Sequence, residues 1–247
     1  MILVTGGTGL IGSHLLFHLT QQGQKVKASY RTEDTLRYVT RVFGYYTEHP
    51  EHLLSAITWV QADLTDIVAL HTLFEGVDRV YHCAALISFA PNDYPALKKN
   101  NVEGTANIVN LCLEYKVDKL CYVSSIAAIS SGALEEVVTE TTDWHSRGAS
   151  VYGITKHQAE LEVWRGTQEG LSAVIVNPGL VIGPGFWQHG SGLLFARAAQ
   201  GKKYAPPGGT GFVSVNDVVR AMMTLMASDI TQERFILVSE NRLYHDI

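Results

Sequence analysis

The sequence has few cysteines, few charged side chains and no long apolar run. Of its 247 residues, 3 are cysteines and 17% are charged. Three cysteines leave at least one unpaired, and Cys83, Cys112 and Cys121 all lie in apolar runs, which predicts reduced thiols in a cytoplasmic protein. No apolar stretch reaches the roughly 18 residues that a membrane-spanning helix needs. The first residues, MILVTGG, lack the basic start of a signal peptide.

Clusters of basic residues are also missing. The net charge is -5, and no run of lysine or arginine forms a local patch, so no nucleic-acid partner is expected. A small-molecule partner fits better. A hydrophobic content of 46% in a chain of this length supports one large core, and no internal repeat or low-complexity tract interrupts it.

Short apolar runs alternate with longer amphipathic segments along most of the chain. The runs typical of buried strands are residues 1–5, 25–30, 57–62, 79–84, 119–124 and 173–178, and the clearest helix candidates are 9–23, 66–76 and 100–116. This alternation predicts an α/β protein with a Rossmann-like, doubly wound parallel sheet covered by helices on both faces.

The pattern changes at about Gly179, where segments rich in glycine and proline begin. We predict a dinucleotide-binding domain over 1–178, to which 212–228 return, and a small substrate-binding region over 179–211 and 229–247. The final segment reads as one strand and the first turn of a helix with nothing to cover them. It therefore predicts a substrate region that is truncated at its C-terminus.

Glycines recur directly after the first predicted strand. In VTGGTGLIG, Gly6, Gly9 and Gly12 stand between that strand and the first predicted helix, which opens with Leu10 and Ile11. Glycines at such a junction permit a tight turn and a close approach of the backbone to a pyrophosphate, and the helix N-terminus presents unpaired N–H groups. We predict that this loop binds a dinucleotide. The alternative is a plain glycine turn.

The second predicted strand ends without the acidic residue that usually holds the ribose of NAD. Arg31 follows it, and a guanidinium matches a phosphate with two parallel hydrogen bonds, so Arg31, with Arg37 as a second candidate, favours NADP. Glu33 and Asp34 stand nearby and weigh toward NAD. NAD therefore stays possible, as does a solvated loop arginine with no such role.

The spacing Tyr-x-x-x-Lys occurs three times, at Tyr94 with Lys98, Tyr115 with Lys119 and Tyr152 with Lys156. Spacing alone does not choose among them. Only Tyr152 follows the serine pair Ser124 and Ser125, which stands at the carboxyl end of a predicted strand, and then opens a helix. Ligands of open parallel sheets bind beyond that edge, so we predict that Tyr152 is the catalytic tyrosine.

A lysine one helical turn from a tyrosine favours the phenolate. At about 4 Å and an effective dielectric constant near 20, the interaction is roughly 4 kcal/mol, or about three pKa units. We therefore expect Lys156 to bring the pKa of Tyr152 close to neutrality, where a general acid works best. Tyr152 would then protonate a carbonyl oxygen as hydride arrives from a nicotinamide. The serine pair could equally cap a turn.

With its T-G-x-x-G-x-x-G loop and its Tyr152–Lys156 pair, the chain resembles the extended short-chain dehydrogenase/reductase superfamily, also described as NAD-dependent epimerases/dehydratases. The resemblance extends over essentially the whole chain. It is greatest with the dihydroflavonol 4-reductase-like and 3β-hydroxysteroid dehydrogenase-like branch, because of Arg31 and the segment YAPPGGTGFVSV.

The resemblance implies roles for further residues. Ser125 would hold the substrate oxygen, Lys156 would also bind the nicotinamide ribose, and Asn101 would shape the central helix. The remaining cofactor contacts that it implies are Asp63, Leu64, Ala84, Ala85 and Pro178. Asp63 could also cap the following helix, and His82 is expected to be a packed strand histidine. Similar enzymes are homodimers, which we expect here as well.

Three aromatic residues are candidates for a substrate pocket, and no metal site is expected. Phe89, Phe186 and Trp187 could line a pocket for an apolar or ring-containing substrate, although core packing explains the last two equally well. His14 and His18 have a metal-binding spacing but no evident third ligand, so no metal is expected. A further prediction is a solvated helix face made of Glu160, Glu162 and Arg165.

The main functional hypothesis is an NADP-dependent oxidoreductase that reduces a ketone or an aldehyde, with Tyr152, Lys156 and Ser125 as its catalytic residues. The segment after Ser125 lacks an acidic pair that dehydratases of the superfamily commonly carry, which argues against dehydration. Two alternatives stay open. One is a sugar-nucleotide epimerase with tightly held NAD, and the other is a dinucleotide sensor without turnover.

Overall fold

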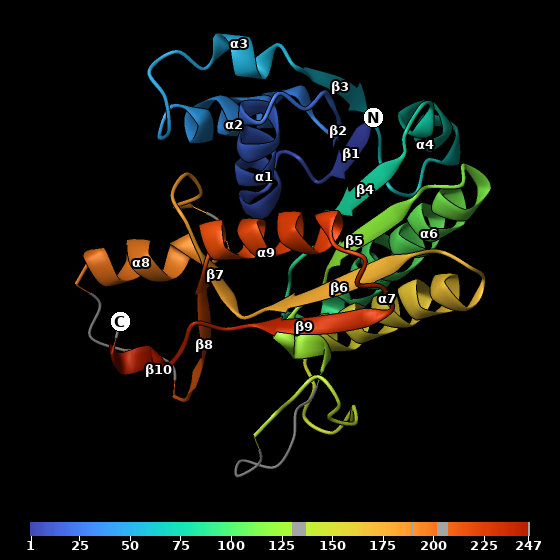
Figure 1. Cartoon of the computed structure of the whole chain (residues 1–247). Helices are drawn as coiled ribbons and strands as arrows, with labels where there is room; N and C mark the ends of the chain where they lie inside the picture. Colours follow the sequence, from blue (N-terminus) through green and yellow to red (C-terminus); the bar gives the residue numbers. More distant parts are fainter. Residues whose placement is uncertain (130–136, 189, 202–206, 247) are drawn as a thin grey trace.

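A central parallel sheet organises the molecule (Figure 1). The computed structural model describes residues 1–129, 137–188, 190–201 and 207–246. Within them, seven strands lie in the order β3-β2-β1-β4-β5-β6-β9. Their bounds are β1 (Ile2–Thr5), β2 (Val26–Tyr30), β3 (Ile57–Gln61), β4 (Arg79–His82), β5 (Lys119–Val123), β6 (Ala173–Pro178) and β9 (Glu233–Leu237). Every neighbouring pair is parallel, which confirms the doubly wound sheet.

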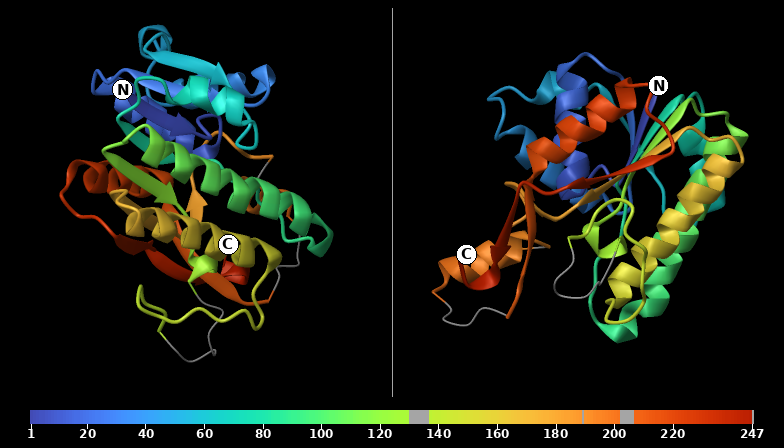
Figure 2. Two further views of the ribbon diagram at one scale, coloured as in Figure 1. Left: turned by 90° about the vertical axis from the view of Figure 1, so that its right-hand side faces the viewer. Right: turned by 60° about the horizontal axis from the view of Figure 1, so that its bottom comes forward.

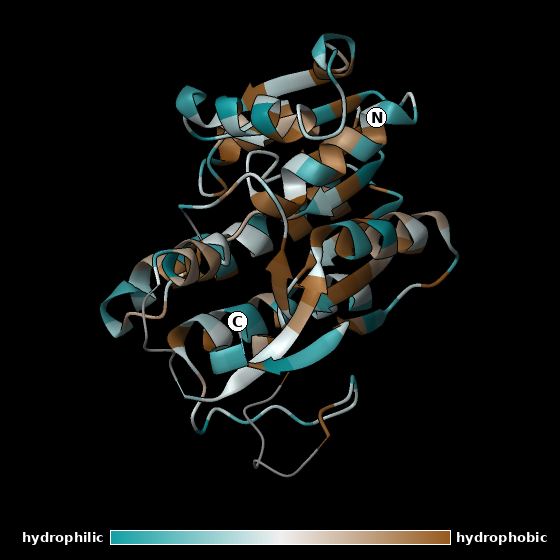
Figure 3. Cartoon of the chain, turned by 90° about the vertical axis from the view of Figure 1, so that its left-hand side faces the viewer, coloured by the Kyte–Doolittle hydropathy of each residue, from teal (hydrophilic) through white to brown (hydrophobic). Residues whose placement is uncertain are grey.

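The middle strands are buried because their sequences are apolar on both faces. All residues of β1, β5 and β6 are buried, and Figure 3 shows hydrophobic residues concentrated on the central strands. The chain runs outward from β1 to β3, returns to β4 and then runs outward in the other direction. The strand order therefore reverses between β1 and β4, and a ligand of an open α/β sheet binds at the carboxyl ends of strands at such a point.

Helices cover both faces of the sheet. Packed against one apolar cluster are α1 (Leu10–Gln21), α2 (Leu36–Phe43), α3 (Glu51–Leu54) and α9 (Val215–Ala227). The other face carries α4 (Ile67–Phe74), α5 (Tyr94–Leu97), α6 (Gly104–Glu114) and α7 (Val151–Gln168). Figure 2 shows α6 and α7 side by side along this face. A π-helical turn at Lys98–Glu103 precedes α6, so the helix predicted over 100–116 begins with wider winding.

A second, small sheet lies beside the carboxyl end of β6. It has the order β10-β8-β7, formed by β7 (Leu180–Ile182), β8 (Gly209–Ser214) and β10 (Glu240–Leu243), with α8 (Gly192–Ala199) beside it. Short 3-10 turns occur at Glu33–Thr35, Pro91–Asp93, Ile126–Ala128 and Tyr244–Asp246. In the described residues, no helix has the length and apolar character needed to cross a membrane.

Strand β9 does not belong to the region in which the sequence places it. Residues 229–247 are predicted to join the substrate region, but β9 extends the main sheet by pairing with β6, from Val174 opposite Glu233 to Pro178 opposite Leu237. The physical reason is that the main-chain groups of β9 satisfy the open edge of β6. Of this segment, β10 joins the small sheet.

Lys119 shows why one of the three Tyr-x-x-x-Lys pairs is structural. It lies on β5, and its Nζ donates to the carbonyl oxygens of Leu225 and Ser228, each at 2.7 Å, at the carboxyl end of α9. A cation is favourable there because the helix dipole places partial negative charge at that end. The hydroxyl of Tyr115 bonds to the ring of His71 instead of facing Lys119.

Candidate active site

Two glycines of the first loop are required by the fold itself. Gly6 has a φ of +67°, and a Cβ on it would lie 2.6 Å from the backbone nitrogen of Ala84. A Cβ on Gly12 would lie 2.2 Å from the carbonyl oxygen of Gly6. The turn after β1 therefore touches both α1 and the segment after β4. This contact brings Ala84, and the exposed Ala85 next to it, to the glycine loop.

Gly9 is not required in the same way. It is exposed, its φ of -89° suits any residue, and a Cβ on it would meet only the Gly6 oxygen at an ordinary 3.4 Å. Gly9 is the N-cap of α1, whose first residues are Leu10 and Ile11, and no side chain caps that end. The free backbone N–H groups at the N-terminus of α1, and the space left by the missing side chain of Gly9, fit a pyrophosphate, because a helix N-terminus favours an anion.

This contrast leads to a prediction for Gly9→Ala and Gly12→Ala. Gly9→Ala should keep the melting temperature close to that of the parent. It should weaken NADPH binding by at least about tenfold, because a methyl group would hinder the approach of the phosphates. Gly12→Ala should destabilise the fold because the Gly6 backbone must move. Thermal unfolding and fluorescence titration with NADPH would measure both effects. Unchanged affinity in a folded Gly9→Ala variant would contradict the assignment.

The candidate contacts to the adenosine half of a dinucleotide lie at the ends of β2 and β3. Arg31 follows β2 with an exposed side chain, and its carbonyl oxygen accepts a hydrogen bond from Gln61 at 3.0 Å. Arg37 is paired with Asp34 at 3.0 Å and is therefore less available than Arg31 for a phosphate.

Asp63 is not the helix cap that the sequence left open. The N-cap of α4 is Asp66, whose carboxylate accepts from the backbone N–H of Ala69. The Asp63 carboxylate accepts from the hydroxyl and the backbone N–H of Thr65, and these two bonds hold its pKa below the usual range. Leu64 next to it packs closely against Gly104, where a Cβ would lie 2.8 Å from the Leu64 Cβ. Asp63 is thus a fixed carboxylate beside the carboxyl end of β3.

Tyr152 and Ser125 are brought together by two short turns. Ser125 caps the 3-10 turn after β5, where its Oγ accepts from Ala127 N at 3.2 Å. Ser150 caps α7 in the same way, with Gly153 N as the donor at 3.0 Å. A Cβ on Gly153 would lie 2.7 Å from the Ala127 oxygen, so the first turn of α7 rests directly on the turn that Ser125 begins. The predicted order of strand, serine pair, loop and helix therefore brings Ser125 and Tyr152 close together in space.

The Tyr152 ring is 8% exposed, and the ring of Phe89 meets it edge-on at 5.7 Å. Burial raises the pKa of Tyr152 to about 12, and the neighbouring Ser125 hydroxyl lowers it in part. The predicted fall of this pKa toward neutrality is wrong in the structure. The reason is that burial outweighs the other influences on the phenol and that the Lys156 ammonium is bound elsewhere.

Lys156 bonds to β5. Its Nζ donates to the hydroxyl of Tyr122 at 2.6 Å and to the carbonyl oxygen of Val123 at 2.9 Å. The side chain is 1% exposed, and burial lowers its pKa to about 7, against the opposing effect of Glu160. Tyr122 is a residue that the sequence reasoning missed. The alternation of faces along β5 places it on the side of α6 and α7, but nothing in the sequence pairs it with a lysine 34 positions later.

Glu160 contradicts the predicted solvated face. It is 1% exposed, pairs with Arg234 of β9 at 3.3 Å and accepts a hydrogen bond from the Asn177 amide, which also donates to the Ser125 carbonyl oxygen at 3.0 Å. Tyr152, Lys156 and Glu160 recur every four residues and so share one helix face. That spacing could have revealed the burial. Of the predicted face, Glu162 and Arg165 do form a partly exposed ion pair at 2.9 Å.

The other predicted cofactor and packing residues take clear positions. His82 is fully buried, hydrogen-bonded to the hydroxyls of Thr5 and Thr105, and neutral, because burial lowers its pKa to about 3. It is a packed strand histidine, as expected. Pro178 is the buried last residue of β6. Asn101, in the π-helical turn, bonds both backbone groups of Leu86 and so holds the segment that follows β4.

The structure separates the predicted aromatic substrate residues. Phe89 is 67% exposed beside Tyr152. Phe186 stacks on Tyr38 of α2 instead, with ring centroids 5.3 Å apart. Trp187 lines a groove of about 560 Å³ between α8 and β8. His189 in the same segment lies outside the described residues. Phe89 alone of these is seen in contact with the candidate catalytic tyrosine.

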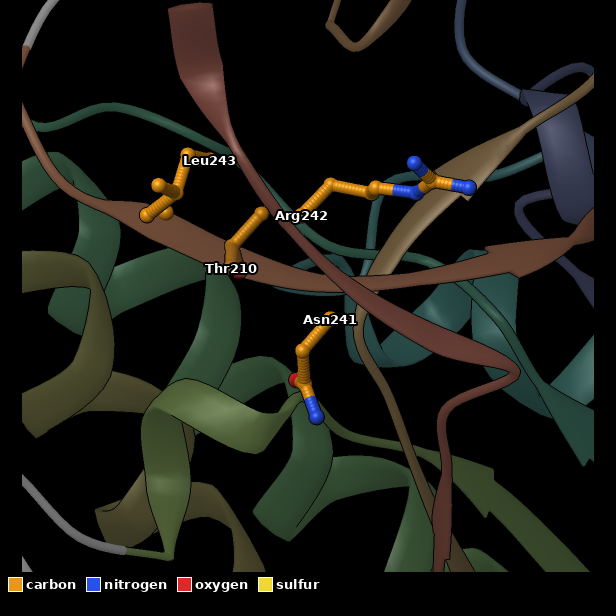
Figure 4. A pocket seen from close by; sticks show the side chains of 5 residues that line it. Thr210, Asn241, Arg242 and Leu243 are labelled. Carbon is orange, nitrogen blue, oxygen red and sulfur yellow. The ribbon is translucent and has the colours of Figure 1, made fainter. Parts of the chain in front are cut away.

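Two other features have structural explanations. His14 bonds to the Tyr46 hydroxyl and to the Pro184 carbonyl oxygen, and the described residues contain no cluster of three or more groups suited to a metal ion. Figure 4 shows a hollow against β8 and β10 with Arg242 and Asn241 on opposite sides of the strand. Arg242 is engaged by Glu240 at 2.9 Å, so its charge is already paired.

A glycine loop at the reversal of strand order, together with a tyrosine, a lysine and a serine near the carboxyl end of β5, is the arrangement of a dinucleotide-binding protein of the short-chain dehydrogenase/reductase class. The chain matches the model of the NAD dependent epimerase/dehydratase family over residues 2–237 and belongs to that family. The family resemblance inferred from the sequence is thereby confirmed.

Named relatives include several reductases. The chain is 29% identical to tetraketide alpha-pyrone reductase 2 of Arabidopsis thaliana, over 96% of this chain and 77% of the relative. It is 28% identical to dihydroflavonol 4-reductase of Gerbera hybrida, over 74% of this chain and 52% of the relative. The chain thus spans about half the length of some curated relatives that it matches. The crystal structure of Thermus thermophilus UDP-glucose 4-epimerase with NAD is similar at a TM-score of 0.81 and 25% identity, over 99% of this chain and 80% of the other.

Proposed function

We propose that the protein is an NADP-dependent oxidoreductase that reduces a ketone or an aldehyde of a small, apolar or ring-containing substrate. The observation that carries this proposal is the meeting of the Tyr152 phenol and the Ser125 hydroxyl beyond the carboxyl end of β5, one helical turn from Lys156. The reductase names of relatives support the reaction class. The resident dinucleotide would supply hydride when bound.

The protein residues would hold the carbonyl and move one proton. Ser125 would donate a hydrogen bond to the carbonyl oxygen, and Tyr152 would give its phenolic proton to that oxygen. Because burial raises the pKa of Tyr152 to about 12, the phenol is protonated at neutral pH and carries the proton that would be transferred. Phe89, edge-on to Tyr152, would exclude water from this oxygen and offer an apolar surface to the rest of the substrate.

The preference for NADP rests on Arg31. Its side chain is exposed beyond β2, and no acidic residue directly follows that strand. The 2'-phosphate would carry about two negative charges, which a guanidinium binds through two parallel hydrogen bonds. The named structural relative with NAD keeps the other cofactor open for the family.

An epimerase is the second candidate, because solved UDP-glucose 4-epimerases share the fold across nearly the whole chain. A dinucleotide sensor is the third, although such a protein has no need of the Tyr152–Lys156 pair. Like similar enzymes, the protein would form a homodimer through the helices that begin near Asn101 and Tyr152, and this also stays a proposal.

Turnover of a carbonyl panel tests the function. Purified protein should oxidise NADPH, followed at 340 nm, when aromatic and alicyclic ketones or aldehydes are added. Copurified NAD that survives dialysis, with interconversion of UDP-sugars, would support the epimerase instead. Saturable NADPH binding without turnover of any panel member would contradict the reductase and favour the sensor.

Arg31→Ala provides the cofactor control. It should weaken NADPH binding by about tenfold or more and leave NADH binding nearly unchanged, since a charge-assisted pair of bonds to the phosphate is lost. Arg37→Ala is the matched variant, with a smaller expected effect because Arg37 is paired with Asp34. Equal losses for both cofactors in Arg31→Ala would overturn the NADP assignment.

A further inference from the structure

The surroundings of Lys156 contain a second tyrosine that no sequence motif assigns. Tyr122 is fully buried on β5, on the same side of the sheet as α6 and α7. Its hydroxyl oxygen accepts a hydrogen bond from Lys156 Nζ at 2.6 Å, and the Nζ lies 4.3 Å from the centre of its ring. A buried ammonium next to a phenol oxygen and a π face is held by both contacts.

The contacts with Tyr122 and Val123 leave one N–H donor of the Lys156 ammonium available. An ammonium has three N–H donors. Tyr122 and the Val123 carbonyl oxygen, adjacent on β5, take two of them. These two acceptors fix both the position and the rotation of the ammonium. The remaining N–H therefore has a set direction, and it is the donor that the resemblance to short-chain dehydrogenases/reductases assigns to the nicotinamide ribose.

Tyr122 is itself held in place by its neighbours. Its ring stacks on the imidazole of His82, with centroids 5.3 Å apart and planes inclined by 29°. His82 is fixed by Thr5, at the start of the glycine loop, and by Thr105 of α6. A continuous series of buried contacts thus runs from the glycine loop to Lys156: the hydrogen bond between Thr5 and His82, ring stacking of His82 on Tyr122, and the hydrogen bond from Lys156 to Tyr122. Both ring nitrogens of His82 are hydrogen-bonded, so the imidazole has a fixed orientation and gives the Tyr122 ring a fixed surface to stack on.

We propose that Tyr122 is the positioning residue of Lys156: its phenol oxygen holds the ammonium in its charged form and aims the free N–H toward the cofactor ribose. The structural part of this assignment stands on the contacts alone, whereas its catalytic consequence rests on the proposed reductase function. If Tyr122 only filled space in the core, a phenylalanine at this position would serve equally well.

Other titratable groups face the Lys156 ammonium. Glu160, one helical turn onward, stabilises its charge, and Tyr152 lies one turn before it on α7. At the end of β4, burial lowers the pKa of His82 to about 3 and raises that of the Cys83 thiol far above its usual value. His82, Cys83 and Tyr152 therefore stay uncharged near neutral pH, where Lys156, with a pKa of about 7, changes its charge.

The test is the titration of Lys156 in Tyr122→Phe, measured by NMR of protein labelled with ¹³C at the lysine Cε, with the signal assigned through its loss in Lys156→Met. Removing a hydrogen bond to a charged group should lower the pKa of Lys156 by about one unit. If the protein is an active reductase, the alkaline limb of kcat/KM should move to lower pH by the same amount. An unchanged Lys156 titration overturns the proposal.

Tyr81→Phe is the matched control. Tyr81 is a buried tyrosine of the adjacent strand β4, but it packs in the cluster on the opposite face, with α1 and α9. Loss of its hydroxyl should leave the titration of Lys156 and the pH profile unchanged. A shift as large as that in Tyr122→Phe would show that any loss of a buried phenol has this effect, and would contradict a specific role for Tyr122.

A measurement on the parent protein covers the case in which Tyr122→Phe fails to fold. The 2.6 Å bond predicts a nuclear Overhauser effect between the Tyr122 ring protons and the Lys156 Cε protons. Its absence would overturn the proposal without any variant. The NMR readouts do not require turnover, so a lowered Lys156 pKa in a protein that reduces no carbonyl would refute the reductase function and leave the positioning contact standing.

Discussion

Tyr152→Phe is expected to lower kcat by about 1000-fold, while the dissociation constant of NADPH stays within about twofold of the parent value. The substitution removes the phenolic proton, and general acid catalysis by a positioned side chain contributes about 100- to 10,000-fold. The phenyl ring still fills the space against Phe89, so packing is retained. Single-turnover kinetics at saturating NADPH would separate the chemical step from binding.

Tyr115→Phe is the matched control for this experiment. Tyr115 belongs to another Tyr-x-x-x-Lys pair, but its hydroxyl bonds to His71 at 3.0 Å, and its lysine caps α9. The variant should keep kcat within about twofold. A Tyr152→Phe protein that remains folded, binds NADPH and retains more than a tenth of the parental kcat would refute the role of Tyr152 as the proton donor.

Arg234→Met is expected to reduce the free energy of unfolding by about 3 kcal/mol, since removing one partner of a buried ion pair leaves the other charge uncompensated. The guanidinium is 17% exposed and the Glu160 carboxylate 1%. Arg234 also donates to the carbonyl oxygens of Glu140 and Thr142, at 2.7 and 3.4 Å, so it fastens this segment to the edge strand β9. Methionine keeps the apolar stem. Urea unfolding would measure the loss.

The loss in Arg234→Met should depend on pH in a defined direction. Burial already raises the pKa of Glu160 above its ordinary value, whereas Arg234 lowers it, so the variant raises it further. A carboxyl group whose pKa is higher in the folded state binds a proton more tightly there. The contribution of Glu160 to the free energy of unfolding is therefore greatest at low pH, and it falls as pH rises through the folded-state pKa of this carboxyl group. The variant should lose less stability at pH 5 than at pH 8.

Two further variants delimit this result. Arg165→Met removes an arginine of α7 that pairs with Glu162 and Glu169, and it should cost less than about 1 kcal/mol because that pair is partly exposed. Glu160→Gln combined with Arg234→Met should recover part of the stability, since no charge is left buried. Equal effects of Arg165→Met and Arg234→Met, or no pH dependence, would contradict a buried ion pair.

Glu160 and Arg234 also affect the candidate site through Asn177. The Asn177 amide donates to both Glu160 and the Ser125 carbonyl oxygen, so the cluster links Ser125 to the helix that carries Tyr152 and Lys156. The sequence predicts Glu160 in solvent because an isolated glutamate on a helix is usually exposed. Arg234 is 74 residues away along the chain, and only the pairing of β9 with β6 brings it near.

Much of the site could be predicted because its chemistry is local in the sequence. The glycine loop lies within one strand-helix junction, and Gly12 is explained by a contact six residues away, with Gly6, although the close approach of Gly6 to Ala84 is a tertiary contact. Tyr152 could be selected from three candidates because a strand ending in serines and a helix start are both readable from pattern. The pKa of Tyr152 could not be predicted from the sequence, because it depends on burial and on where the Lys156 ammonium is bound.

By itself, the sequence determined the alternation of strands and helices and predicted a dinucleotide-binding loop with Tyr152 and Lys156 as catalytic candidates, because periodicity and helix spacing act over a few residues. Only the tertiary structure decided that β9 completes the main sheet, that Tyr122 receives the lysine and that Glu160 is buried against Arg234. These contacts join residues 34 to 74 positions apart. Packing of strands and helices, which no local pattern encodes, selects such partners.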